Sequence, residues 1–393
     1  GVLSGYTPNL RLKGEKAMAI RSYLMAITPK SVDALSFQTG LNCLREEMHS
    51  WAKTKVHLKK IRVEQLVGDL IISFLSGMYL GSPISRLLVR EFFPIPFVFP
   101  SIFRIPFFML PQYYRMNKGL HAIRAQIKSS LNYEGLVEKA QTAGLSEEDA
   151  LRSLLTMMLF NGAGLTNPIT NAFFLLPLLP RQGQELLSDD NQLDSFCWEL
   201  LRFSGPDSFR KMTTDSMIPS ANGNEYKVKA GTHLYTVLGA VNRDETVWSE
   251  PHTFKANRFL NKPSDTLSTP SNGQEPLPTL QFGCPLGHLR NTDEMKTTHR
   301  CIFTLLCQPF LKEFVRIIIR EFSWSLNKAT KEFMKQQVLV SGVHENTYLK
   351  VNMDETVVTG GTRFTIDHVP KVKYGTYFHS FEENTSINYT EKL

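Results

Sequence analysis

The segment that most constrains the fold is the most hydrophobic stretch with helical spacing, residues 145–180, LSEEDALRSLLTMMLFNGAGLTNPITNAFFLLPLLP. It opens with Ser146 followed by acidic residues, which is a typical helix N-cap signal. Other segments also have apolar residues three or four apart, with charged residues between them. Residues 10–60 predict two amphipathic helices, and residues 113–144 predict one long helix ending at a glycine. Helices are also predicted over residues 64–81 and 190–203.

A smaller part of the chain has strand character. Residues 226–242, YKVKAGTHLYTVLGAVN, predict two short strands around a turn at Ala230-Gly231, and the tail from about 330 predicts short strands with turns. Residues 262–278 are rich in Pro, Ser and Gly and predict a loop, and about 378–393 predict a loose polar tail. With no internal repeat and no clean linker, residues 1–393 are expected to form a single domain, mainly α with a smaller β portion.

The charge pattern limits the partners that the chain is expected to bind. Its 393 residues carry a formal net charge of +7, but Lys and Arg are spread along the chain, so we expect no nucleic-acid partner. A mildly basic protein attracts carboxylate ligands or an anionic membrane surface. The chain begins at Gly1 without a charged and then apolar leader, so we expect any targeting segment to be absent or removed.

No run of eighteen or more apolar residues occurs, which argues against a membrane span. The nearest candidate is FFPIPFVFPSIFRIPFFMLP, residues 92–111, in which prolines and Arg104 forbid a continuous helix. This segment predicts either an apolar mouth for a lipid-like substrate, with peripheral contact to an intracellular membrane, or a loop packed on the core.

Glu199 and Arg202 lie three residues apart on one helix face, as an ordinary surface ion pair would. Their neighbours in the sequence are Trp, Leu and Phe, however, so the pair is expected to be buried and to need further partners. Arg258, in the apolar sequence FKANRFLN, is available as a third member.

An ordered set of motifs resembles the cytochrome P-450 superfamily: E-L-L-R at 199–202, Arg-Phe at 258–259, and a Cys at the head of an apolar helix, Cys301. The resemblance implies that Glu199, Arg202 and Arg258 form a structural triad beside a haem loop. It also implies that Cys301 is the axial ligand of haem b iron, a role that suits a thiolate stabilised by a helix N-terminus.

A narrower resemblance is to the branch that rearranges fatty-acid hydroperoxides: allene oxide synthase, hydroperoxide lyase and epoxyalcohol synthase. It rests on GYTPNLRLKGEKAMAIRSYL near the start, the FNGAG of the hydrophobic segment, RFSGPDSF with the strands after it, and a long insertion between Phe282-Gly283 and Cys301. The branch implies a fatty-acid hydroperoxide substrate and no need for dioxygen, NADPH or a redox partner.

Monooxygenases of the superfamily use an acidic residue beside Thr or Ser in this helix to deliver protons to bound dioxygen. In residues 160–167, FNGAGLTN, Thr166 has no carboxylate beside it, so such proton delivery would be poor. A substrate that brings its own O–O bond fits better. The resemblance implies that Asn161 is catalytic and donates from its amide to the peroxide oxygens. The alternative is that Asn161 only satisfies a kinked backbone beside Gly162 and Gly164.

The resemblance also gives His299, and Lys211 or the adjacent Arg210, as residues that bind the haem propionates. Among the other cysteines, Cys43 and Cys197 are expected to be small buried residues, and Cys307 a core residue. Cys284, in FGCPLG, is the rival ligand, but no apolar helix follows it directly.

Several positions depart from the family pattern. Phe303 stands where a glycine is expected two residues after the ligand, and Leu165 replaces the second glycine of F-N-x-x-G-G. Residues 181–190 are too few for the usual helix, and the resemblance implies that the N-terminal part of the family fold is missing from this sequence. The alternatives to a hydroperoxide enzyme are therefore a conventional monooxygenase with a redox partner and a degenerate, haem-free relative that binds lipid.

Overall fold

The structure is a computed structural model, in which α-helices dominate and a smaller β portion accompanies them, as the sequence predicts. The residues that it describes are 14–54, 61–84, 111–176, 179, 187–204, 208–212, 214–219, 223–236, 241–242, 244–251, 253–260, 301–326, 348–358 and 361–369.

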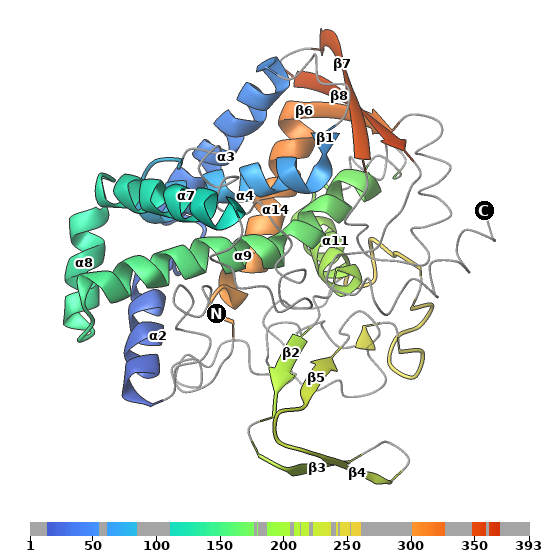
Figure 1. The fold of residues 1–393 in the computed structure, drawn as a ribbon. Coiled ribbons are helices and arrows are strands. Elements are labelled where there is room, and N and C mark those ends of the chain that lie inside the picture. The colour runs from blue at the N-terminus through green and yellow to red at the C-terminus, as the bar shows by residue number, and fades with distance from the viewer. Residues whose placement is uncertain are drawn as a thin grey trace.

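The described helices surround one long helix that crosses the molecule (Figure 1). They are α2 (Glu15–Ile27), α3 (Leu35–Thr54), α4 (Val63–Leu80), α7 (Pro111–Lys128), α8 (Tyr133–Thr142), α9 (Glu147–Leu175), α11 (Asp190–Phe203) and α14 (Thr304–Glu321). The amphipathic helices expected within residues 10–60, the apolar helix near 64–81 and the helix over 190–203 are all present.

The long helix α9 is the central element, because α2, α4, α8, α11 and α14 all contact it. Its start is fixed by a capping box, in which Ser146 Oγ accepts from the Asp149 amide at 3.1 Å and Asp149 Oδ2 accepts from the Ser146 amide at 3.3 Å. The helix then carries apolar residues on most of its circumference, so it is buried by the helices around it.

Helices α3 and α4 approach each other closely, which a pair of glycines permits. A Cβ atom at Gly77 would lie 2.7 Å from Cys43 Sγ, and one at Gly40 would lie 2.7 Å from the Phe74 carbonyl oxygen. Both contacts are too short for real side chains, so the spacing of these two core helices depends on glycine.

The prediction of a single helix over 113–144 is wrong, because α7 ends at Lys128 and a separate helix, α8, begins at Tyr133. At the break, the hydroxyls of Ser129 and Ser130 donate back to the carbonyls of Gln126 and Ile127, and Asn132 becomes the N-cap of α8. Serine hydroxyls compete for backbone groups in this way and so favour helix ends.

The described strands form one four-stranded sheet and two small antiparallel pairs. The sheet has the order β1 (Ile61–Arg62), β7 (Tyr348–Val358), β8 (Gly361–Val369), β6 (Phe322–Leu326), with β6 and β8 parallel. The pairs are β2 (Ser208–Lys211) with β5 (His233–Thr236) and β3 (Ser216–Pro219) with β4 (Glu225–Val228).

The two strands expected around Ala230-Gly231 are present as β4 and β5, with Gly231 at φ 89° between them. They do not pair with each other, because each pairs with an earlier strand. The expectation of short strands in the tail is also wrong for β7 and β8, which have 11 and 9 residues.

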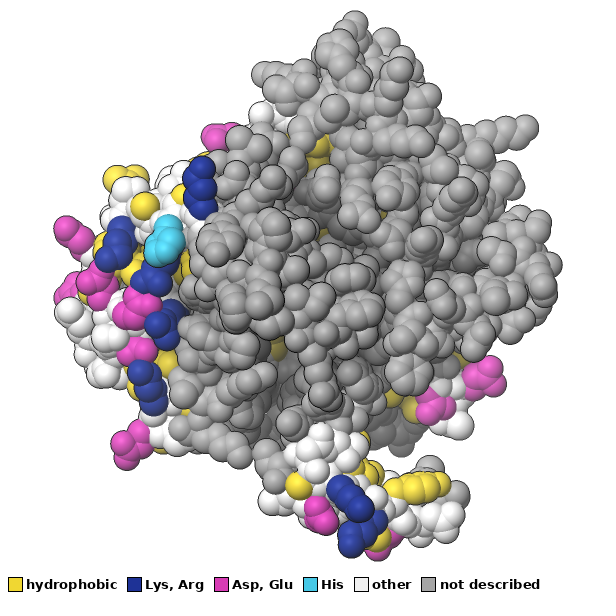
Figure 2. All heavy atoms as spheres, in the orientation of Figure 1, with side chains coloured by type: hydrophobic (Ala, Val, Ile, Leu, Met, Phe, Trp, Pro, Cys, Tyr) yellow, Lys and Arg dark blue, Asp and Glu magenta, His cyan; other side chains and the backbone are white. Residues whose placement is uncertain are grey.

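The surface in Figure 2 mixes acidic and basic side chains along the edge formed by α7, α8 and the start of α9. Examples of the pairing there are Lys128 with Glu147 at 2.7 Å and Arg152 with Glu148 at 2.7 Å. Among the described helices, none is both long and apolar enough to cross a membrane. The predicted 262–278 loop, the polar tail and residues 92–110 of the proline-rich segment lie outside the described residues.

Candidate active site

Glu199 and Arg202 form a fully buried ion pair on α11. Arg202 Nε donates to Glu199 Oε2 and Arg202 Nη2 donates to Oε1, both at 2.8 Å, and both side chains are 0% exposed. This bidentate geometry is the strong form of the arginine–carboxylate interaction. The alternative of a surface pair is therefore wrong for these two residues.

Arg258 joins the pair from a segment that follows α11 by more than fifty residues. Its Nε lies 3.0 Å from both carboxylate oxygens of Glu199, and its side chain is 1% exposed. The amide of Lys255 also donates to Glu199 Oε1 at 2.9 Å. The structure thus brings together the three residues that the sequence grouped.

The cluster holds two cations and one anion, and backbone carbonyls satisfy the remaining guanidinium protons. Arg202 donates to the carbonyls of Asn242, Pro251 and Thr253, and Arg258 donates to those of Ser249, Glu250 and Thr253. Buried charges are tolerated only when they are paired and hydrogen-bonded in this manner. The cluster therefore fixes the path of residues 242–258 against α11.

Cys301 lies at the turn that leads into α14, and its side chain is half-buried against the core. The N-cap position of α14 is Phe303, so the thiol is two residues before the positive end of the helix dipole. Arg21 of α2 is within electrostatic reach: burial lowers the pKa of its guanidinium, and the negative charge of a Cys301 thiolate opposes that change. Both the helix dipole and this guanidinium stabilise a thiolate at the position.

The other described cysteines have a different character. Burial raises the pKa of the Cys43, Cys197 and Cys307 thiols. Each is buried in the helical core, as expected for small apolar residues. Of the four described cysteines, Cys301 is the one that is not buried, whereas Cys284 and His299 lie outside the described residues.

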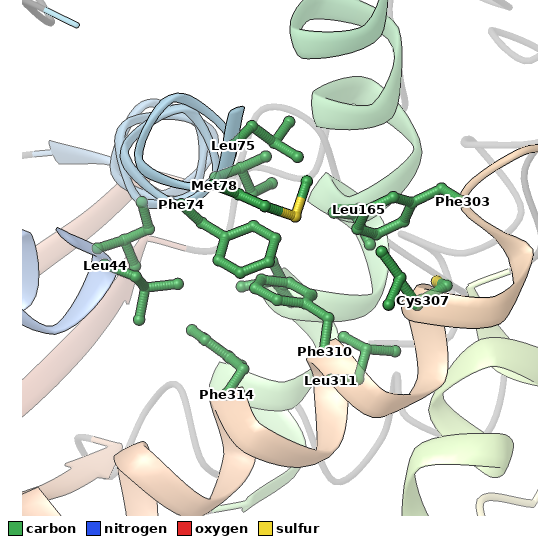
Figure 3. Close-up of a cluster of buried hydrophobic side chains, with 14 of the residues drawn as sticks. Leu44, Phe74, Leu75, Met78, Leu165, Phe303, Cys307, Phe310, Leu311 and Phe314 are labelled. Carbon is green, nitrogen blue, oxygen red and sulfur yellow. The ribbon is translucent and has the colours of Figure 1, made fainter. Parts of the chain in front are cut away.

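Phe303 and Leu165, the two positions that depart from the family pattern, are both in the core, 3% and 2% exposed. Figure 3 shows the ring of Phe303 pointing from the start of α14 toward Leu165 of α9, with Met78 of α4 beside them. A bulky side chain in place of each glycine thus fills the space between the same two helices. The ring is directed into the helical core, and Cys301 remains partly accessible.

This packing defines which face of α9 is turned toward the Cys301 turn. Leu165 faces the start of α14, and residues three, four or seven apart share a helix face. Asn161, Gly164, Leu165 and Pro168 therefore share one arc of α9 that is about 100° wide. The structure describes only the backbone at Asn161, and the same holds for Arg210 and Lys211 in β2.

The residues at the Cys301 turn fit a thiolate-ligated haem. They supply one partly accessible cysteine, a helix N-terminus and a nearby guanidinium, and the bulky Phe303 is packed away into the core. Arg21 was not predicted as a site residue, although it is a single basic residue within the apolar stretch AMAIRSYLMAI. Tyr79 of α4 was not predicted either; it is within electrostatic reach of Cys301, and its hydroxyl lies 3.2 Å from that of Thr28.

Comparison with known proteins bears on the family and the fold. The cytochrome P450 family model matches residues 186–283. A mitochondrial hydroperoxide bicyclase of Plasmodiophora brassicae is 32% identical over 184 residues, which are 41% of this chain and 34% of that protein. A 20-oxo-5-O-mycaminosyltylactone 23-monooxygenase of Streptomyces fradiae is 30% identical over 124 residues, 31% of this chain and 29% of that protein.

Solved structures give the fold over most of the chain. Ligand-free cytochrome P450 OleT superposes with a TM-score of 0.59 at 13% identity, covering 88% of this chain and 80% of that one. Cytochrome P450SP alpha in complex with (R)-ibuprofen gives a TM-score of 0.53 at 14% identity, covering 79% of this chain and 73% of that one.

The chain therefore has the cytochrome P450 fold, and the family-model match supports the cytochrome P450 superfamily. The chain spans about a third of the length of the curated relatives that it matches.

Proposed function

We propose that the protein is a haem-thiolate enzyme that converts polyunsaturated fatty-acid hydroperoxides without dioxygen, NADPH or a redox partner. The observation that carries the proposal is that Phe303, two residues after Cys301, faces Leu165 on the arc of α9 that also contains Asn161 and lacks any carboxylate. Cys301 would hold the haem iron, with His299 and Lys211 at the propionates.

The composition of α9 supports the choice of substrate. Its acidic residues, Glu147, Glu148 and Asp149, all lie in the first turn, and none follows along the rest of the helix. General acid catalysis needs a group of suitable pKa within hydrogen-bond reach. Such a helix is poorly equipped to deliver protons to bound dioxygen, whereas a hydroperoxide already contains the O–O bond that is to be cleaved.

Bound haem supplies one-electron chemistry at that O–O bond. The contributions of the chain are positional: Asn161 donates a hydrogen bond from its amide to a peroxide oxygen, and Leu165 and Phe303 keep the adjoining space apolar and closed to water. Excluding water strengthens the amide hydrogen bond and protects a radical from side reactions. The triad of Glu199, Arg202 and Arg258 acts at a distance by holding the segment after α11 in place.

The product belongs to one of three types within this chemistry: an allene oxide, an epoxyalcohol or a chain-cleavage product of a hydroperoxide lyase. Two similarities support the lipid class. One relative is named a hydroperoxide bicyclase. A structural neighbour at 12% identity, a variant of cytochrome P450 OleT, was solved in complex with arachidonic acid. Peripheral membrane contact, through which a lipid would arrive, is part of the proposal.

The direct test is to incubate the haem-loaded protein with a linoleic acid hydroperoxide in the absence of NADPH and reductase. Consumption of the hydroperoxide and formation of an isomer or cleavage product are expected. Asn161→Ala should slow turnover by about 10²–10³-fold if the amide acts in the transition state, by analogy with loss of one oxyanion donor. Asn161→Gln, which keeps the amide on a longer side chain, is the matched control and should lose less.

Two results would contradict the proposal and favour another function. Activity that requires NADPH and a reductase would indicate a conventional monooxygenase, the activity in the name of the Streptomyces relative. Failure of the protein to retain haem, with binding of fatty acid intact, would indicate a lipid-binding relative without catalysis.

A further inference from the structure

Pro168 lies inside α9 and interrupts the hydrogen-bond ladder of that helix. In an α-helix, the carbonyl of residue 164 accepts from the amide of residue 168, but proline has no N–H. The carbonyl of Gly164 therefore cannot receive this bond. An unsatisfied carbonyl inside a protein calls for another donor, since leaving it unpaired costs free energy.

The interruption is on the arc of α9 that includes Leu165, which faces the start of α14. Gly164 follows Asn161 by three residues, and Pro168 follows Leu165 by three, so all four share one arc of the helix. Leu165 lies near Phe303, two residues beyond Cys301, and both Leu165 and Pro168 are buried. A donor for the Gly164 carbonyl must then come from a water or ligand next to this arc, or from a neighbouring part of the chain.

We infer that the Gly164 carbonyl, released by Pro168, is the acceptor for the hydroxyl proton of the substrate. This inference rests on the proposed function and makes it more specific. A hydroperoxide group has one O–H donor and two acceptor oxygens, so it can donate to the Gly164 carbonyl while accepting from Asn161, one turn away. The site then selects compounds with an O–H at the reactive carbon over ketones, ethers and dialkyl peroxides.

The inference predicts a preference in binding that needs no turnover. Calorimetric titration of the haem-loaded protein with a hydroxy-linoleic acid and the corresponding oxo-linoleic acid compares two stable ligands that differ at one group. The wild-type protein should bind the hydroxy acid about three- to tenfold more tightly, the range expected for one hydrogen bond.

Pro168→Ala restores an amide that can close the ladder, so it should abolish the preference for the hydroxy acid over the oxo acid. The matched control is Pro309→Ala, which repairs the equivalent interruption inside α14, where Pro309 is half-buried. That variant should keep the preference. Hydrogen exchange in Pro168→Ala provides a second readout, because the new amide at residue 168 should be protected if it bonds to the Gly164 carbonyl.

Three outcomes would overturn the inference. They are equal binding of the two ligands by the wild-type protein, a preference that survives in Pro168→Ala although the new amide is protected, and an unprotected amide at residue 168. If the wild-type protein still consumes a hydroperoxide without NADPH, each of these results leaves the proposed function standing. The opposite result is also possible: the hydroxy acid is preferred and Pro168→Ala removes the preference, but no hydroperoxide is consumed. That result would refute the proposed reaction and support the proposed binding site.

Discussion

Arg258 Nε lies 3.0 Å from both oxygens of Glu199, although the two residues are 59 positions apart in the chain. Arg202 donates to the same carboxylate, so one anion holds two buried cations. Glu199→Gln should therefore destabilise the protein by about 3–5 kcal/mol, the usual result of leaving buried charges without a partner. Urea unfolding of the haem-loaded protein measures this change.

The matched control is Glu147→Gln, the same substitution at a carboxylate whose side chain is 48% exposed and pairs with Lys128. An exposed pair contributes less than about 1 kcal/mol. Equal losses in the two variants would show that the Glu199 cluster does not anchor the fold.

The sequence allowed this cluster to be predicted because its members lie in apolar local sequences, where an unpaired charge would be costly. It could not give the carbonyls that complete the cluster, since backbone groups of residues 242–253 leave no mark in the side-chain pattern. Helix α9 was predictable from Ser146 and the apolar run after it. The break between α7 and α8 was not, because the helical spacing of apolar residues continues through Ser129 and Ser130.

Strand pairing was also beyond the sequence. The segment around Gly231 has the pattern of a hairpin, but β4 and β5 each pair with an upstream strand. Pairing depends on register and tertiary packing, which local alternation does not fix. The same is true of the site, because the sequence shows single residues but not their contacts. Phe303 and Leu165 each depart from the family pattern in the sequence, whereas their common location is visible only in the structure (Figure 3).

The packing between Phe303 and Leu165 predicts energetic coupling. Phe303→Ala alone should cost about 3–5 kcal/mol and Leu165→Ala about 2–5 kcal/mol, as is usual for buried residues. The double variant should lose less than the sum, with a coupling energy of about 0.5–3 kcal/mol. Urea unfolding of the four proteins in this cycle measures the coupling. Additive losses would mean that the two side chains do not share one packing space.

The start of α9 predicts a stability effect that depends on pH. Burial alone would raise the pKa of Asp149, but hydrogen bonds from Lys16 and Ser146 outweigh that effect and hold the pKa below its usual value. Ser146→Ala should therefore cost about 1 kcal/mol at neutral pH. The contribution of Asp149 is present above the pKa of the unfolded chain and is lost as the pH falls through the folded value.

Thermal unfolding of the wild type and Ser146→Ala between neutral and acidic pH checks this prediction, with Ser146→Asn, another good N-cap residue, as the control. The difference between wild type and Ser146→Ala should shrink in acid. A difference that is constant with pH would exclude coupling between the cap and Asp149.

The described cysteines should differ in reactivity. Cys301 is half-buried beside a helix N-terminus, whereas burial raises the pKa of Cys43, Cys197 and Cys307. Brief treatment of the native protein with iodoacetamide at neutral pH, followed by peptide mass spectrometry, should label Cys301 well before these three. Loading with haem should then protect Cys301. Labelling of Cys307 at the same rate would contradict the assignment of thiolate character.

The central claim is that the Cys301 sulfur binds haem iron, and the absorption spectrum of the reconstituted protein tests it most directly. The wild-type protein and Cys284→Ser should both give the Soret band of a thiolate-ligated ferric haem, and Cys301→Ser should lose it. Loss of that band in Cys284→Ser with its retention in Cys301→Ser would contradict the account.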